Sequence, residues 1–283
     1  MKKAIAILAA LLMAASLASC ANTPADAAQP ALSGTVKTGG STSVESVMTA
    51  LIYQFQENNR SVTVNYEMNG SGDGIKNTIS GLYEIGHSSR ELKTDGSESG
   101  LDAVAYAIDG IAIIVNKANT TQTLTKDQVK GIYTGAITSW SEVGGQDALI
   151  TVVTREEGSG TRSAFAEIIG LEKSGDDSTA IVSYAAVSDS TGAVQTTVSQ
   201  NPDAIGYISF SEVDANQVNT VQYEGVTVSS DSLKDGTYKL KREFYLVTKQ
   251  GATLTPAAQA FKDYVLGTDG QKIVGEKKLL PIK

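Results

Sequence analysis

The sequence predicts an α/β fold in which a mostly parallel sheet is flanked by helices. Along most of the chain, strand-like segments alternate with segments of helical periodicity. The strand-like segments either alternate apolar and polar residues or are continuously apolar. Three of the turns that lead from a strand into a helix combine glycine with serine or threonine. Ligands of such sheets bind at the carboxyl ends of the strands, which is where these turns fall. The fold class therefore also indicates where a site should be sought.

The first strand–turn–helix unit begins with a strand at 35–38 and continues through Gly39 and Gly40. Ser41, Thr42 and Ser43 follow as a helix start signal. The apolar face of the expected helix is formed by Val44, Val47, Met48, Leu51 and Phe55.

The second unit has a strictly alternating strand at 62–67 and a glycine-rich turn at 70–74 that contains Ser71. Its helix is expected to place Ile75, Ile79 and Leu82 inward. A short strand then leads through Gly86 and His87 to Ser88, Ser89 and Arg90.

The third unit has an apolar strand at 149–153, then Arg155 and a Gly-Ser-Gly-Thr turn at 158–161. The helix that follows should bury Phe165, Ile168 and Ile169. Glu157 is expected to pair with Arg155, whereas Glu156 and Arg162 are expected to be solvated.

The remaining elements are predicted from apolar runs, caps and helical spacing. The run at 103–116, interrupted by Asp109-Gly110, suits either a buried strand pair or one strand crossing between lobes. A helix from Thr125 should close at Gly135, and Trp140 is expected to pack in the core. Further helices are predicted at 180–186 and 192–199, strands at 204–210 and 244–248, and a last helix from Thr255-Pro256.

The N-terminus has the pattern of a secretory signal at 1–19: Lys2 and Lys3, an apolar run at 4–17, and small residues before Cys20. The run is too short for a spanning helix, and Leu17-Ala-Ser-Cys20 resembles the bacterial lipobox. Cys20 is the only cysteine, so it cannot form an internal disulfide, and lipidation there would tether the protein to the outer face of the membrane. Residues 20–33 are expected to be a flexible leash.

The charge balance argues against a nucleic-acid partner. The chain has 23 Lys and Arg against 31 Asp and Glu, a formal charge of −8, and loses Lys2 and Lys3 with the signal. Nucleic-acid binding requires a basic face. An acidic protein can still hold a small anion if local donors do the binding.

The turn at 158–161 has the chemistry of an oxyanion socket. A helix start leaves unpaired N–H groups that point at one spot, and the helix dipole adds partial positive charge there. Ser159 and Thr161 add hydroxyl donors, and Arg155 offers a planar fork for two oxygens. A single motif of this kind is equally compatible with an ordinary surface turn and with an oxyanion socket. Three such helix starts together favour a shared anion site.

Taken in order, these motifs resemble the PstS-type phosphate-binding lipoproteins of bacterial ABC importers, over essentially the whole chain after the signal. The resemblance rests on Gly40–Ser43, Gly70–Gly74, Gly86–Arg90, Ala107–Gly110 with Val115-Asn116, Gly131–Gly135 with Trp140, and Arg155–Thr161.

The resemblance implies a two-lobed periplasmic-binding-protein-like fold of type II, in which each lobe is a mostly parallel sheet flanked by helices. Two hinge crossings, near Val115-Asn116 and Arg242-Glu243, would give lobe I as 34–115 with 243–283 and lobe II as 116–242. It also implies a monomeric, non-enzymatic binding protein on the extracytoplasmic face, without cofactor or metal, that delivers inorganic phosphate to an ABC permease. The implied binding positions are Ser41, Thr42, Ser43, Ser71, Arg155, Ser159, Gly160 and Thr161.

One departure bears on ligand choice. The family carries an aspartate, which accepts the proton of bound phosphate, where this chain has Ser89. Asp109 is a candidate substitute acceptor and Arg90 a further donor, although Asp109 could equally be a turn residue. Sulfate, molybdate or tungstate therefore remain alternative ligands. An exported phosphoester hydrolase using Ser159 is the alternative from another class, but His87 is the sole histidine and no histidine base stands near Ser159 in any clear arrangement.

Overall fold

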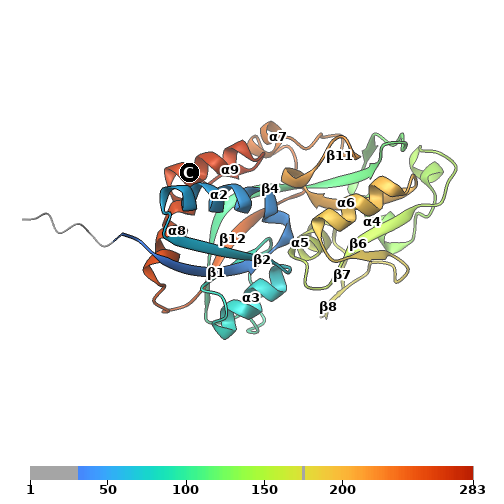
Figure 1. Cartoon of the computed structure of the whole chain (residues 1–283). Coiled ribbons are helices and arrows are strands. Elements are labelled where there is room, and N and C mark those ends of the chain that lie inside the picture. The colour runs from blue at the N-terminus through green and yellow to red at the C-terminus, as the bar shows by residue number, and fades with distance from the viewer. Residues whose placement is uncertain (1–30, 174–175, 283) are drawn as a thin grey trace, which may run out of the picture. The chain divides into compact units, whose positions relative to one another are not determined.

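The computed structural model describes residues 31–173 and 176–282 (Figure 1). Residues 33–283 form one compact unit. The predicted signal, Cys20 and nearly all of the predicted leash lie outside the described residues. In the part of the chain that is described, no helix has both the length and the apolar character needed to cross a membrane.

The described residues build a long mixed sheet, which confirms the α/β class. The sheet contains two groups of strands, and the strands within each group run parallel to one another. Two long strands, which pair antiparallel with each other, lie between the two groups. Along the sheet the order is β2 (Val62–Met68), β1 (Gly34–Gly40), β3 (Ile85–Ser88), β12 (Lys241–Lys249), β4 (Leu101–Asn116), β10 (Ala204–Ser209), β6 (Thr151–Arg155) and β9 (Ala186–Ser188). Short strands extend it or stand apart: β5 (Thr123–Leu124), β11 (Val218–Tyr223) and β13 (Leu280–Pro281) extend it, and β7 (Glu172–Lys173) pairs with β8 (Asp176–Thr179).

The apolar run at 103–116 is a single strand, β4, and not a pair of strands. Its residues 101–110 pair with β12, and its residues 111–116 pair with β10 and β11. β4 therefore belongs to both strand groups. The segment Ile111–Val115 is fully buried, as its composition predicted.

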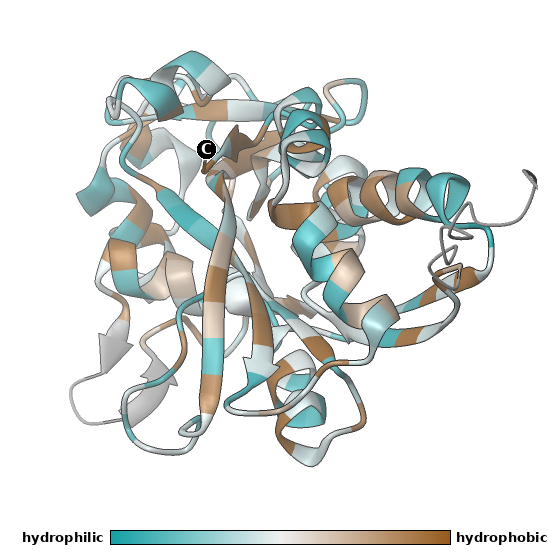
Figure 2. Ribbon diagram, turned by 90° about the vertical axis from the view of Figure 1, so that its left-hand side faces the viewer, coloured by the Kyte–Doolittle hydropathy of each residue, from teal (hydrophilic) through white to brown (hydrophobic). Residues whose placement is uncertain are grey.

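The helices pack on the two strand groups separately. α2 (Glu45–Asn58), α3 (Ser71–Ser80), α8 (Pro256–Leu266) and α9 (Thr268–Glu276) lie with the β2-β1-β3 group, whereas α4 (Lys126–Thr134), α5 (Gly160–Ile169) and α6 (Thr191–Gln200) lie with the β10-β6-β9 group (Figure 1). α7 (Ser230–Lys234) packs on β4, and three 3-10 turns complete the fold: η1 (Thr42–Val44), η2 (Trp140–Val143) and η3 (Phe210–Glu212). The helices carry both hydrophobic and hydrophilic residues (Figure 2), as amphipathic helices covering a sheet must.

The predicted core faces are largely confirmed. In α2 the buried residues are Val47, Met48, Leu51 and Phe55. Phe165 of α5 stacks on Tyr207 of β10 with ring centroids 3.9 Å apart. Trp140 is fully buried and its Nε1 donates to the Asp203 carbonyl at 2.9 Å, so it packs in the core as expected.

Three local predictions are wrong. Residues 180–186 form a turn leading into β9: the N–H of Ala185 bonds to the Val182 carbonyl, and those of Ala180 and Val182 bond to the distant carbonyls of Leu171 and Tyr133. α3 ends before Gly81, which has the left-handed conformation (φ 80°), and both Ile79 and Leu82 are exposed rather than inward. The helix from Thr255 is not the last, because α9 follows it.

Candidate functional site

Four helix starts bring serine and threonine side chains together in the interior. They belong to η1 and α2, to α3, to α5 and to α6, and each follows a strand of the sheet. Ser89, directly after β3, lies with them. The group, here called the hydroxyl cluster, consists of Ser41, Thr42, Ser43, Ser71, Ser89, Thr161 and Thr191. All seven residues are at most 4% exposed.

One side of the cluster joins the start of α2 to the starts of α5 and α6. Ser43 Oγ lies 2.6 Å from Thr161 Oγ1 and 3.3 Å from Thr191 Oγ1. Thr42 Oγ1 lies 3.2 Å from Thr191 Oγ1 and accepts from the Thr191 N–H at 3.3 Å. Two strand–turn–helix units predicted separately from the sequence therefore meet at one place.

The other side joins the end of β3 to the start of α3. Ser41 Oγ donates to Ser89 Oγ at 2.9 Å, and Ser71 Oγ lies 3.2 Å from Ser89 Oγ. Gly160 approaches both so closely that a Cβ there would stand 2.4 Å from Ser71 Oγ and 2.5 Å from Ser89 Oγ. A Cβ at the start of α5 would therefore force Ser71 and Ser89 to shift, which glycine avoids.

Arg155, at the end of β6, presents its guanidinium to the cluster. It is 1% exposed, and its Nη2 donates to Thr42 Oγ1 at 3.2 Å while its Nη1 donates to Thr191 Oγ1 at 3.4 Å. Its Nε and Nη2 also donate to the two carboxylate oxygens of Glu156, both at 2.8 Å. The pairing expected with Glu157 is wrong: Glu157 lies in the exposed turn, whereas Glu156 orients the fork.

Ser159 has a structural contact of its own. Its side chain is 1% exposed and caps α5, accepting from the Arg162 N–H at 3.2 Å. Arg162 is only half-exposed rather than solvated, and its Nη1 donates to the Arg155 carbonyl at 3.2 Å. The predicted residues 155–162 therefore form one compact corner, with Gly160 and Thr161 facing the cluster.

The side chains of Arg90 and Asp109, both predicted site residues, bond to groups outside the hydroxyl cluster. The guanidinium of Arg90 pairs with Glu98 through Nη1–Oε2 at 2.9 Å and Nη2–Oε1 at 2.5 Å, and it also donates to the Glu91 carbonyl. Asp109 lies inside β4, not in a turn, and its Oδ2 lies 3.2 Å from Arg242 Nη2.

Asp109 reaches the cluster only through Arg242, whose Nη1 donates to the Ser89 carbonyl at 3.3 Å. Asp109 Oδ1 accepts from Ser209 Oγ at 2.9 Å. Burial raises the pKa of Asp109 to about 6, although the nearby Arg242 opposes the rise. The same burial lowers the pKa of Arg242, which Asp109 counteracts.

Sequence reasoning missed Thr191 and Arg242. Thr191 could have been found, because Ser188, at the end of β9, is followed closely by Ser190-Thr191-Gly192 at the start of α6, the pattern of the other units. Arg242 carried no local signal, since its role depends on lying opposite Asp109 in the β12–β4 pairing.

His87 is a buried core residue. Its Nε2 lies 2.8 Å from Thr38 Oγ1, and its ring packs edge-on against Tyr66. Burial lowers the pKa of His87 to about 3, so the ring is neutral near pH 7. Among the described residues no group of His, Cys, Asp and Glu is arranged to hold a metal ion.

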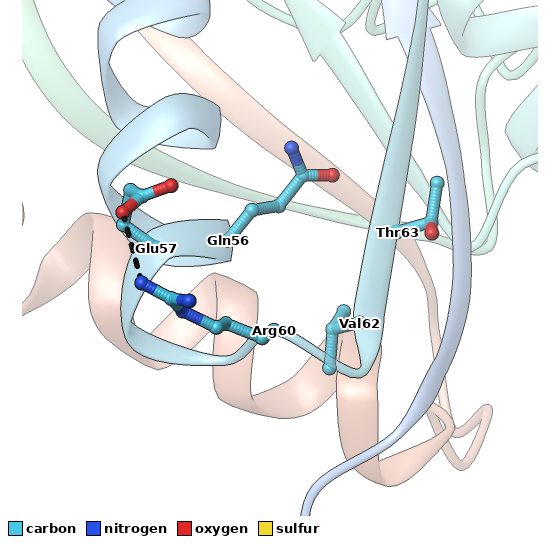
Figure 3. A pocket seen from close by; sticks show the side chains of 5 residues that line it. All are labelled: Gln56, Glu57, Arg60, Val62 and Thr63. Atoms are coloured by element: carbon cyan, nitrogen blue, oxygen red, sulfur yellow. Dashed lines mark ion pairs between the residues drawn. The ribbon is translucent and has the colours of Figure 1, made fainter.

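A surface depression lies away from the cluster (Figure 3). It is lined by Gln56, Glu57, Arg60, Val62 and Thr63, with Arg60 and Glu57 forming an exposed ion pair. Gln56 and Glu57 are at the C-terminal end of α2, about 20 Å along a 14-residue helix from its start at the cluster, and Val62 and Thr63 begin β2. We therefore assign the depression no part in the candidate site.

Comparison with known proteins gives a consistent result. The PBP superfamily domain matches residues 25–269. The phosphate-binding protein PstS of Bacillus subtilis is 30% identical over 258 residues, covering 88% of this chain and 81% of the relative. That of Borreliella burgdorferi is 27% identical over 253 residues, covering 88% and 90%.

Solved structures agree with these relatives. A Clostridium perfringens protein, described as a phosphate ABC transporter substrate-binding protein and solved with bound phosphate, is 41% identical with a TM-score of 0.83. The similarity covers 88% of this chain and 100% of that one. An ABC-type phosphate transport receptor from Vibrio cholerae is 33% identical with a TM-score of 0.71, covering 87% and 99%.

Proposed function

This chain belongs to the PBP superfamily and, within it, to the family of the phosphate-binding protein PstS, and we propose that it captures inorganic phosphate for an ABC importer. The observation that carries the proposal is the convergence of the hydroxyl cluster and the Arg155 guanidinium on one buried place. A tetrahedral anion has several oxygens pointing in different directions, so it needs donors from several elements at once. Four helix starts and one guanidinium supply such a set.

The proposed donors would bind the anion mainly through neutral groups, so few formal charges are placed in the interior. Each helix start contributes unpaired N–H groups and the positive end of its dipole. Ser43, Ser71, Thr161 and Thr191 contribute neutral hydroxyls that can rotate toward an anion oxygen. Arg155 supplies a full positive charge in contact with the hydroxyls, and Glu156 fixes its orientation. Because the place is buried, each of these bonds is stronger than it would be in water.

We further propose that the protein closes around the anion by a hinge motion between lobe I, residues 34–115 with 243–283, and lobe II, residues 116–242. The contacts between Thr42 and Thr191 and between Ser43 and Thr161 link these two parts of the chain. In this proposal β4 and the start of β12, near Arg242-Glu243, serve as the hinge, and the anion is bound between the lobes.

The place of the protein in the cell is proposed from the sequence alone. A signal at 1–19 with lipidation at Cys20 would export the chain as a monomer and hold it on the extracytoplasmic face of the membrane. An ABC permease in that membrane would be its partner.

Calorimetric titration of the purified chain with inorganic phosphate tests the proposed function. We expect one phosphate per chain, no release of product, and loss of tight binding in Arg155→Ala. Absence of phosphate binding by a folded wild-type protein would overturn the proposal.

A second oxyanion is favoured by one observation, the serine at position 89. The Ser89 hydroxyl bonds to the hydroxyls of Ser41 and Ser71, and neither of these bonds involves a carboxylate. A carboxylate at this position would reject an anion that has no proton to donate. Competition of sulfate, molybdate and tungstate against phosphate separates the two ligand classes. Selection of phosphate by a factor of about 1,000 or more, equivalent to roughly 4 kcal/mol, would argue against the second class.

A phosphoester hydrolase has less support. The Ser159 hydroxyl caps α5, and the neutral His87 bonds to Thr38, so these two residues are not paired as nucleophile and base. Hydrolysis of a generic phosphoester that is lost in Ser159→Ala would favour this function instead.

A further inference from the structure

We propose that Glu212 is a positioning residue of the anion site that couples phosphate binding to the uptake of a proton. The inference rests on the proposed function and adds to it a residue that touches none of the cluster hydroxyls. It begins from a long-range contact: a carboxylate from a distant part of the chain bonds to an N–H in the first turn of α2.

η1 leads directly into α2, and Ser41 caps η1 by accepting the N–H of Ser43 at 3.2 Å. At the junction, the N-cap residue of α2 is Val44, which makes no side-chain cap bond. Glu212, at the end of η3, instead accepts the N–H of Ser46 through Oε1 at 3.0 Å. Since η3 also packs against η1, the carboxylate is held against the beginning of the helix.

The same helix start serves the proposed anion site. Ser43, which joins the cluster, is three residues before Ser46, about 5 Å along a helix axis. A bound phosphate and the Glu212 carboxylate would therefore both draw on the positive end of one helix dipole. Two negative charges at one helix start repel each other, so binding of the anion favours the protonated form of Glu212.

A chain of polar contacts connects Glu212 to the opposite side of the cluster as well. Ser211 Oγ lies 2.7 Å from Ser209 Oγ, which donates to Asp109 at 2.9 Å. Ser211 Oγ also lies 3.5 Å from Glu212 Oε1. Arg242 continues from Asp109 to the Ser89 carbonyl. A change in the charge of Glu212 is thus felt at both edges of the cluster.

The surroundings place the proton exchange of Glu212 near neutral pH. Burial raises the pKa of its carboxyl to about 7, and Asp109 and Glu45 add to the rise, while the bond from the Ser46 N–H opposes it. Other ionisable groups near Glu212 or η3 are Tyr66, Tyr106 and Lys278, whose Nζ lies 5.6 Å over the Phe210 ring. An added negative charge at the helix start raises this pKa further, so the proton is taken up on binding.

Glu212→Gln isolates the titration from the cap, since the glutamine oxygen can still accept from Ser46. Wild type and variant are titrated with inorganic phosphate from about pH 6 to about pH 8.5, in buffers of different ionisation enthalpy. Phosphate's own ionisation is the same for both proteins and cancels in the comparison. Glu57→Gln is the matched control, because it removes an exposed carboxylate from the far end of the same helix.

We expect the two proteins to bind phosphate alike at low pH and the wild type to bind more weakly at high pH. The ratio grows by up to about tenfold for each unit by which the anion raises the Glu212 pKa. The wild type should also take up a fraction of a proton more per phosphate than Glu212→Gln. Equal pH profiles and equal proton counts in the two proteins overturn the inference, whereas failure of both to bind phosphate overturns the proposed function.

A second measurement covers the case in which Glu212→Gln does not fold. Isotope-edited infrared spectra of wild type labelled at glutamate separate Glu212 from Asp109. Addition of phosphate near the Glu212 pKa should increase the protonated carboxyl band of glutamate. No change in that band at saturating phosphate contradicts the coupling.

Discussion

Replacing Gly160 by alanine should weaken phosphate binding far more than it weakens the fold. Gly160 opens α5, and its backbone is not in the left-handed region that only glycine favours. Alanine is a better helix former than glycine, so the helix itself gains rather than loses. The difficulty lies across the site, where the new Cβ would meet Ser71 Oγ at 2.4 Å and Ser89 Oγ at 2.5 Å.

The size of the effect follows from that geometry. Ordinary van der Waals contact begins at 3.4 Å, so the start of α5 must withdraw from Ser71 and Ser89 by about 1 Å. Overpacking of this kind typically costs about 1–3 kcal/mol. If the strain is relieved by separating the two lobes, the whole penalty appears in the phosphate Kd as a weakening of about 5- to 150-fold.

Calorimetric titration with phosphate measures this penalty, and thermal unfolding without phosphate measures the fold. Gly158→Ala is the matched control, because a Cβ at Gly158 would meet nothing within 4 Å. We expect Gly158→Ala to bind like wild type. Equal affinity of Gly160→Ala and Gly158→Ala would refute the idea that α5 and α3 must meet around the anion.

Arg155→Ala should weaken phosphate binding by more than about 100-fold, because it removes a full positive charge in contact with the cluster hydroxyls. Arg162→Ala, which loses a bond to a carbonyl, should change phosphate binding by less than about threefold, and calorimetry that found the reverse order would contradict the assignment. Asp109→Ala should lower the free energy of unfolding by about 3–5 kcal/mol, since it leaves the buried Arg242 guanidinium without its carboxylate, and an unchanged denaturant midpoint would show that the pair is not structural. Because Glu212 has a folded-state pKa of about 7, above its ordinary value of 4.5, the folded protein holds a proton that the unfolded chain releases between those values, and stability is lost as pH rises through that window. Urea unfolding at about pH 8 should therefore find Glu212→Gln more stable than wild type by up to about 3 kcal/mol, with the difference vanishing below about pH 4.5.

Much of the site could be predicted because strand–turn–helix patterns are local. Glycines and hydroxyls ahead of an apolar helical stripe locate a helix start, and this was enough to single out Thr42, Ser71 and Thr161. Local patterns do not say which starts meet. That Ser43 contacts Thr161, 118 residues away, follows from the topology of the sheet, which the family resemblance supplied.

The errors arose where tertiary contacts decide between local choices. Glu156 and Glu157 are both close enough to Arg155 in sequence to pair with it. The N–H of Glu156 still bonds to Ser188, which keeps Glu156 beside the strand, while Glu157 turns outward. The Asp109–Arg242 pair depends on strand register, and no sequence pattern fixes that register across 133 residues.

The chain separation of the cluster contacts has a consequence for how the protein folds. Bonds such as Thr42 to Thr191 close a loop of 149 residues, and long loops delay the contacts that they join. Both strand groups can therefore acquire their packing before the hydroxyls meet. Trp140, the sole tryptophan, is buried in the core beside the β10-β6-β9 group, so its fluorescence reports the packing of that group. After dilution from denaturant, we expect tryptophan burial to precede the ability to retain radioactive phosphate, because ligand capacity is the last property to be acquired.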